Sequence, residues 1–265
     1  MLEILAGRLL APYVGVSLET YTAIIGTVLA GIALGAAAGG WAADRVDPRR
    51  LVPALLAVGG ALSMASIPIV RLLGGDAGPG ADVGMPSVIL AGAGFVPATG
   101  VLSAVPPAVV KLQLRDLGAT GVTVGRLSAF GTAGAIAGTF LAGFVLVAYA
   151  AVTTLIVTVG AVLVAAGLAM WLAGQRTDER AMLTAGGLVV ASALGLVTVD
   201  AACDLQTGYY CVSIVGDPDR ATGRVLVLDD LPARDRQRLM ARRVPFVVPF
   251  VHAYLPPAID SRERA

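Results

Sequence analysis

Long runs of uncharged, mostly apolar residues restrict the fold of this chain more than any other feature. All but one of the runs have about 20 residues, which as an α-helix matches a hydrocarbon layer about 30 Å thick. The bilayer core offers no water to the backbone, so each run must bond its own N–H and C=O groups as a helix. The runs are Tyr21–Ala43, Leu51–Val70, Ser87–Val110 (interrupted by Pro97, Pro106 and Pro107), Ser128–Leu172 and Met182–Val199.

The run Ser128–Leu172 is too long for a single crossing, and we expect two helices that meet near Tyr149–Thr153. Met1–Pro12 is apolar but too short to cross, and we expect it to be the end of a helix that starts before this sequence. The predicted fold class is therefore an all-α polytopic membrane helix bundle over residues 1–200, with six full spans plus an N-terminal partial helix.

The overall composition agrees with a membrane protein and argues against a soluble domain. Apolar residues make up 57% of the chain and charged residues 14%, whereas soluble domains have roughly 45–50% and about 25%. Lys and Arg number 19 and Asp and Glu number 18, so no excess of positive charge points to a nucleic-acid partner. With two Cys and one His, we expect no zinc site. The sequence has no Walker motif, and we expect no bound cofactor.

Basic residues gather in alternate connections between the spans. The positive-inside rule places such connections in the cytoplasm, so we predict a multi-pass protein of the cell membrane with the lipid bilayer as a partner. The region after Val199 is then extracytoplasmic. The basic connections hold Arg45, Arg49, Arg50, Lys111, Arg115, Arg126, Arg176 and Arg180, and the opposite ones hold Arg71.

Glycines recur every four residues in two of the runs, which places them on one face of a helix. Gly31, Gly35 and Gly39 form one stripe, and Gly134 and Gly138 form another. Small residues at this spacing let helix backbones approach closely. We interpret both stripes as helix-packing faces, and the alternative is a substrate pathway along them.

An acidic residue among arginines follows the first full span. The residues concerned are Gly40, Asp44, Arg45, Arg49 and Arg50. The segment resembles the Gly-x-x-x-Asp-Arg signature after the second helix of major facilitator transporters, with Asp47-Pro48 where that family has a Gly. The resemblance implies a cytoplasmic latch between bundle halves, and the alternative is an anchor loop that obeys the positive-inside rule.

Two further ionisable residues, Glu3 and Arg8, lie in the short apolar segment that precedes the first span. Ionisable groups at membrane depth are costly, and they are usually paired or functional. We therefore regard both as candidate intramembrane groups, with an interfacial position as the alternative.

The character of the sequence changes after Val199. Tyr209–Val215 alternates as a strand does, Gly216–Gly223 contains turn residues, and Arg224–Asp229 is typical of a returning strand. We predict a small extramembrane β-hairpin within residues 201–231. A lone hairpin is marginally stable in water, so it needs a sheet, the bundle or a partner to rest on.

Cys203 and Cys211 flank a short segment in this hairpin region. An extracytoplasmic location makes a disulfide between them chemically reasonable, and two unpaired thiols are the alternative. Residues 232–265 form a divergent tail rich in Arg and Pro, with a short helix expected at Asp235–Arg242.

Leu2–Gly15, continuing into Thr22–Arg45, and the pair of segments Tyr209–Val215 and Gly223–Asp230 carry a resemblance to a known family. The first part is similar to the membrane region of fused major facilitator/spermidine synthase proteins, and the pair resembles the first hairpin of their synthase domain. The resemblance implies aminopropyl transfer from decarboxylated S-adenosylmethionine. In that family a glycine-rich Rossmann-like core follows the hairpin, whereas the residues after Leu231 contain no glycine-rich loop.

The sequence thus predicts an integral membrane spermidine synthase-like protein, truncated before its cofactor-binding core and without aminopropyltransferase activity by itself. Two alternatives stay open: a small-molecule, polyamine-type transporter, and a membrane anchor or assembly subunit whose hairpin docks a partner sheet. The expected protein partner is a separate synthase domain or a second copy of this chain.

Overall fold

A computed structural model provides the fold and describes residues 1–75, 84–114, 120–173, 179–198, 205–206, 211–216 and 224–228. The chain divides into two units, Met1–Pro232 and Ala233–Ala265. The second unit lies outside the described residues, and so does the short helix expected at Asp235–Arg242.

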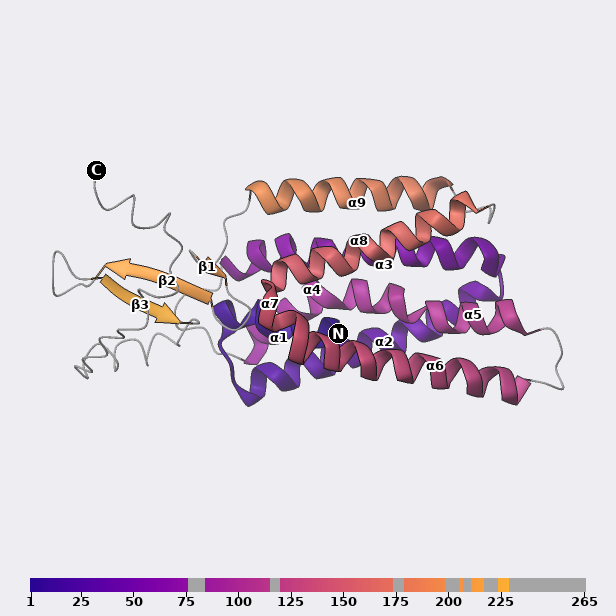
Figure 1. The fold of residues 1–265 in the computed structure, drawn as a ribbon, viewed down its shortest axis with the longest axis horizontal. Coiled ribbons are helices and arrows are strands. Elements are labelled where there is room, and N and C mark those ends of the chain that lie inside the picture. The colour runs from indigo at the N-terminus through magenta and orange to yellow at the C-terminus, as the bar shows by residue number, and fades with distance from the viewer. Residues whose placement is uncertain are drawn as a thin grey trace. The chain divides into compact units, whose positions relative to one another are not determined.

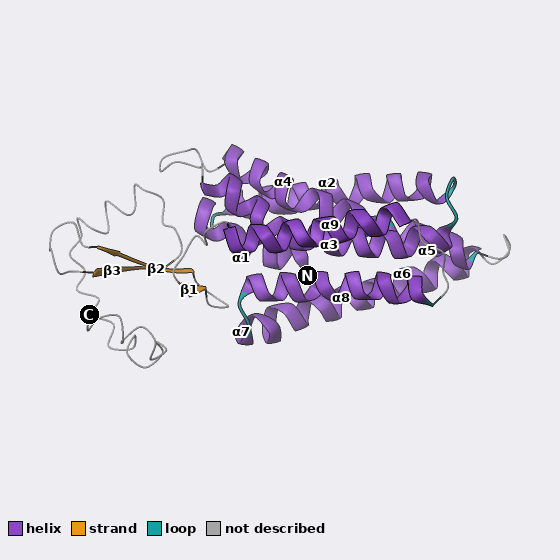
Figure 2. Ribbon diagram, turned by 90° about the horizontal axis from the view of Figure 1, so that it is seen from above, coloured by secondary structure: helices purple, strands orange, loops and turns teal. Residues whose placement is uncertain are grey.

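Helices that run side by side make up most of the described chain (Figure 1). They are α1 (Leu2–Val14), α2 (Leu18–Ala43), α3 (Pro48–Gly75), α4 (Gly84–Ser103), α5 (Val105–Gln113), α6 (Thr120–Phe140), the π-helix η2 (Leu141–Leu146), α7 (Val147–Tyr149), α8 (Val152–Leu172) and α9 (Glu179–Thr198). Among the described connections, those from α1 to α2, from α2 to α3 and from α7 to α8 are short, as Figure 2 shows for the connection from α2 to α3.

Several of these helices are long and apolar enough to cross a membrane. Within the described ranges, five helical segments meet that condition, and they correspond to α2, α3, α4 with α5, α6 to α7, and α8. In α9 the apolar helical stretch is shorter, Leu183–Gly195, and a stretch of that length is not by itself a span. The helical membrane architecture is therefore supported, while the sixth crossing stays a prediction.

The long run Ser128–Leu172 is divided close to the predicted place. Helix α7 ends at Tyr149, the backbone at Ala150 is extended, and α8 begins at Val152. The π-helix η2 just before this break was not predicted, because a single wider turn leaves no clear mark on hydropathy.

The proline-rich third run breaks at one place only. Pro97 lies inside α4 without ending it, and the interruption falls at Ala104, before Pro106 and Pro107. Both of these prolines lie at the start of α5, where a missing backbone N–H costs no helical hydrogen bond. The expectation that Pro97 breaks the run is therefore wrong, whereas the other two prolines mark the break.

The turn between α1 and α2 shows how local chemistry sets the helix ends. Gly15 adopts a φ of 71°, a left-handed value that favours glycine, and its N–H donates to the Ala11 carbonyl. Ser17 then caps α2, because its Oγ accepts a hydrogen bond of 3.1 Å from the Thr20 N–H.

The predicted glycine stripe Gly31, Gly35 and Gly39 is the seam along which α2 packs against α4. A Cβ atom on Gly35 would collide with the backbone of Gly100, and one on Gly39 would collide with Ala104. The two backbones therefore meet with almost no side chain between them, and the prediction for this stripe is confirmed.

The second stripe, Gly134 and Gly138 on α6, does not pack in this way. No described atom lies within 4 Å of a Cβ built on Gly134, and on Gly138 only the Met1 sulfur lies as near as 4.0 Å. None of the residues of α6 is buried. Within the described chain, the prediction of a helix-packing face at this stripe is wrong.

Helix α3 lies at the centre of the packing and contacts α4, α8 and α9. Its contact with α8 uses glycines from both helices. A Cβ on Gly60 would collide with the Gly160 carbonyl, and one on Gly167 would meet Pro53 and Ala57. The close approach fits membrane helices, which associate through backbone contact and small residues.

Two apolar clusters mark opposite ends of the bundle. One joins Ala43, Val52 and Ala108 to Met170, and so brings together the end of α2, the start of α3, α5 and the end of α8. The other, larger cluster contains most of the buried face of α1, including Leu5, Leu9 and Leu10. It also contains Ile24, Val70, Leu90, Phe95, Val147 and Val152. Alternate connections therefore lie at the same end, as an up-and-down bundle requires.

A small antiparallel sheet lies in the segment after α9. Its strands are β1 (Leu205–Gln206), β2 (Cys211–Gly216) and β3 (Arg224–Leu228), in the order β1-β2-β3. Val212 pairs with Leu228 and Gly216 with Arg224. In this order β3 has one neighbour among the described strands.

Candidate functional site at the turn between α2 and α3

The turn between α2 and α3 is short because both helix ends are capped within it. The N–H of Asp44 donates to the Gly40 carbonyl and closes the last turn of α2. Asp47 precedes α3, and its Oδ1 accepts a hydrogen bond of 3.0 Å from the Arg49 N–H. An aspartate at this position followed by proline is a favourable helix start. The departure of Asp47-Pro48 from the transporter signature therefore has a structural reason.

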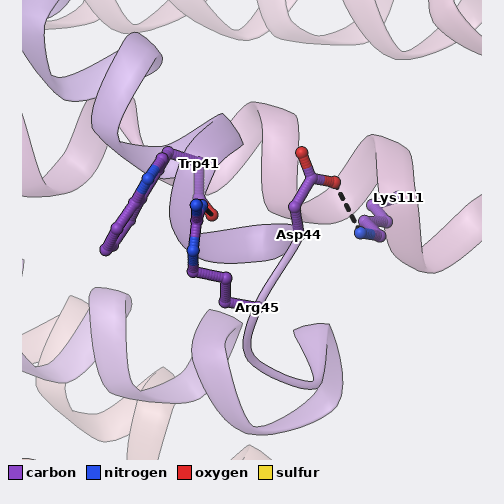
Figure 3. A network of polar contacts seen from close by, with 4 residues as sticks. All are labelled: Trp41, Asp44, Arg45 and Lys111. Carbon is purple, nitrogen blue, oxygen red and sulfur yellow. Dashed lines mark hydrogen bonds and ion pairs between the residues drawn. The ribbon is translucent and has the colours of Figure 1, made fainter.

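Asp44 forms an ion pair with Lys111, which lies in the last turn of α5 (Figure 3). The distance from Lys111 Nζ to Asp44 Oδ1 is 2.6 Å. The pair therefore ties the α2–α3 turn to a helix that lies far along the chain. The hydrogen bond from Lys111, and then its positive charge, hold the pKa of Asp44 below its ordinary value.

Solvent limits what this ion pair contributes to stability. The side chain of Asp44 is 71% exposed and that of Lys111 is 42% exposed. Exposed pairs gain little energy because water and salt screen them and both side chains lose freedom. The pair can therefore fix the position of the turn and can break without great cost.

Arg45 turns away from Asp44 and stacks on the ring of Trp41 (Figure 3). Its Cζ lies 4.0 Å from the ring centroid, a cation–π distance. Its Nη1 also donates to the Trp41 carbonyl at 3.1 Å. The structure thus brings Trp41 and Lys111 into a site that the sequence had assigned to Gly40, Asp44 and the arginines.

The sequence did not indicate Lys111 as part of this site, because its partner Asp44 lies in a distant segment. The only signal for it was its place among the basic connections at the same end of the bundle. Trp41 also left a signal, since Trp at the end of an apolar run is typical of a membrane interface. Gly40 itself is not closely packed, because nothing lies within 4 Å of a Cβ built there.

The other candidate residues do not join this site. In α1, Glu3 is exposed and Arg8 is partly buried, while Leu5 and Leu10 fill the bundle core. Among the described residues, no group of three or more His, Cys, Asp or Glu side chains gathers as a metal site.

The expected disulfide stays a prediction, because Cys203 lies outside the described residues. Of Cys211 only the strand position is described, and there it pairs with Gln206 of β1.

No family model, no curated protein and no solved structure matches the chain. The assignment that rests on the structure is therefore a mostly helical protein whose long apolar helices suit a lipid bilayer.

Proposed function

We propose that this chain is the membrane-embedded component of a spermidine synthase-like protein, and that its bundle anchors a docking sheet. The antiparallel pairing of β2 with β3 supports the proposal. β2 overlaps the segment Tyr209–Val215 and β3 lies within Gly223–Asp230, and these segments resemble the first hairpin of the synthase domain.

The residues that follow the hairpin contain no glycine-rich loop for a cofactor of aminopropyl transfer. The sequence has no glycine after Gly223, and the tight turn that receives a nucleotide-like cofactor depends on glycine. The proposed role is therefore to hold a synthase core at the membrane rather than to catalyse the transfer alone.

The edge of β3 that has no partner among the described strands supports docking as the mode of contact. Among the described strands, β3 pairs with β2 on one side only. An unpaired strand edge presents N–H and C=O groups that a strand from another sheet can complete. The sequence of β3, Arg-Val-Leu-Val-Leu, has no proline to prevent such pairing.

Two measurements test the proposal. The full chain, purified in detergent and supplied with putrescine and decarboxylated S-adenosylmethionine, should form no spermidine, and robust formation would refute a purely anchoring role. A separately expressed synthase core should co-purify with the chain, and a proline at Val227 in β3 should abolish this because it removes a backbone donor. Retention of the core by the Val227→Pro chain would refute docking through β3.

A second candidate is transport of a small, polyamine-type molecule, and the ion pair between Asp44 and Lys111 supports it. This ion pair is exposed and joins the α2–α3 turn to α5 at the end of the bundle. It can therefore break and re-form between two arrangements of the helices. In proteoliposomes, Asp44→Asn and Lys111→Gln should each change polyamine flux. The swap of Asp44→Lys with Lys111→Asp should restore the flux, and flux that none of these variants alters would exclude the latch.

A further inference from the structure

The turn between α2 and α3 carries an excess of positive charge, because its two carboxylates lie among three arginines and Lys111. Its two acidic side chains are already engaged, Asp44 by Lys111 and Asp47 by the first turn of α3. The arginines of the turn, Arg45, Arg49 and Arg50, are exposed and form no ion pair within the described residues.

The position of two of these arginines is unfavourable in the isolated chain. Arg49 and Arg50 lie in the first turn of α3, where the helix dipole is positive and favours anions. Their charges and the dipole therefore add to one another at the same end of the helix. A negatively charged partner at this place would relieve the repulsion.

Trp41 indicates what kind of surface this end meets. Its side chain is 62% exposed and lies in the last turn of the apolar helix α2. Tryptophan is enriched where the hydrocarbon layer meets the headgroups, since its ring is apolar and its N–H is polar. Arg45 covers one face of the ring, so the cationic side chain and the interfacial aromatic side chain lie at the same depth.

We propose that the α2–α3 turn is a binding surface for anionic phospholipid headgroups. The headgroup phosphates accept hydrogen bonds from Arg49 and Arg50 and from the donors of Arg45 that do not bond Trp41. The ring of Trp41 lies against the upper acyl chains of the same lipids. Charge complementarity selects the partner, because basic clusters beside a membrane span attract the anionic lipids of the leaflet.

Quenching of Trp41 fluorescence by brominated lipids tests this surface directly. The chain has two tryptophans, so a Trp171→Phe variant of the full chain leaves Trp41 as the only reporter. This variant is reconstituted in vesicles that contain phosphatidylcholine and phosphatidylglycerol. In one sample the phosphatidylglycerol carries bromine on its acyl chains, and in the other sample part of the phosphatidylcholine carries it. Phosphatidylglycerol should be enriched beside Trp41 by about five-fold, and high salt should reduce the enrichment.

Removal of the arginines should remove the preference. In the Trp171→Phe background, Arg45→Gln, Arg49→Gln and Arg50→Gln together should equalise quenching by the two lipids. The ratio of the quenching by the two lipids is compared, because it cancels any change in the intrinsic emission of Trp41 when Arg45 no longer covers its ring. Far-UV circular dichroism should show unchanged helix content, and equal helicity with an unchanged preference would overturn the proposal.

Two controls separate this surface from a general attraction of the bundle for negative charge. Trp171 lies at the same end, next to Met170 of the cluster with Ala43, and is 40% exposed. A Trp41→Phe chain, which reports on Trp171, should show little preference for phosphatidylglycerol. Arg126→Gln removes one exposed charge from α6 and should leave the preference at Trp41 intact.

Three other outcomes would overturn the proposal. They are equal quenching of Trp41 by both lipids, an equal preference at Trp171, and an effect of Arg126→Gln as large as that of the triple variant. If free inorganic phosphate or an acidic peptide competed fully for this surface and phosphatidylglycerol did not, the surface would be assigned to that other partner instead.

Discussion

The backbones of α2 and α4 meet at Gly35 and Gly100, so closely that a Cβ atom on Gly35 would collide with the carbonyl group of Gly100. The colliding atoms belong to backbone, which cannot move aside as the end of a flexible side chain can. Glycine at position 35 is therefore a requirement of the seam.

Gly35→Ala should destabilise the bundle by about 1–3 kcal/mol, since inserting a methyl group into a tight interface forces helices apart. Gly134→Ala is the matched control, because nothing lies within 4 Å of a Cβ there. It should be neutral or stabilise α6 slightly through the better helix propensity of alanine. Thermal unfolding in detergent, followed by circular dichroism, measures both, and equal effects would contradict the close approach of α2 and α4.

Phe95→Ala should cost about 3–5 kcal/mol of folding free energy, the usual range for truncating a buried aromatic ring. Phe95 is fully buried in the cluster that also holds Leu5, Leu10 and Ile156. Phe130 on α6 is 72% exposed, so Phe130→Ala should change the stability little. Denaturant titration of both variants in the same detergent checks the difference, and a smaller loss at Phe95 would place the core elsewhere.

The ion pair between Asp44 and Lys111 should depend on pH in one direction. The pKa of Asp44 lies below its ordinary value of 3.8 because the carboxylate accepts a hydrogen bond from Lys111. The small stabilisation is therefore fully present above about pH 4 and is lost as the pH falls through the lowered pKa.

Melting curves of the wild type and Asp44→Asn should accordingly differ slightly at neutral pH and converge in acid. High salt should also reduce the difference because both side chains are exposed. Lys111→Gln should reproduce the effect, and the double variant should add nothing to either single one. A difference that persisted in strong acid would show that Asp44 acts through something other than its charge.

The orientation of the chain can be measured with its own cysteines. If the basic connections are cytoplasmic and α9 crosses the membrane, then Cys203 and Cys211 lie outside, and a membrane-impermeant maleimide should label them in intact cells after mild reduction. Labelling without reduction would show free thiols in place of the expected disulfide. Labelling only after the cells are permeabilised would contradict the predicted extracytoplasmic location of the segment after α9.

The helices of this protein could be predicted from the sequence because the constraint behind them is local. A run such as Leu51–Val70 without charge must satisfy its own backbone in a bilayer, whatever surrounds it. The same reasoning located the break near Tyr149, where α7 ends. It misjudged Pro97, because a proline inside a membrane helix can be accommodated by its neighbours, and this one is.

Which helix faces which was decided by the tertiary structure. The stripes at Gly35 and at Gly134 have the same spacing, yet only the first meets another backbone. Asp44 had arginines beside it in sequence, yet its partner is Lys111, because the fold brings the ends of α2 and α5 together. Spacing states which residues share a face or a turn, but the partner of that face depends on packing between segments far apart in the chain.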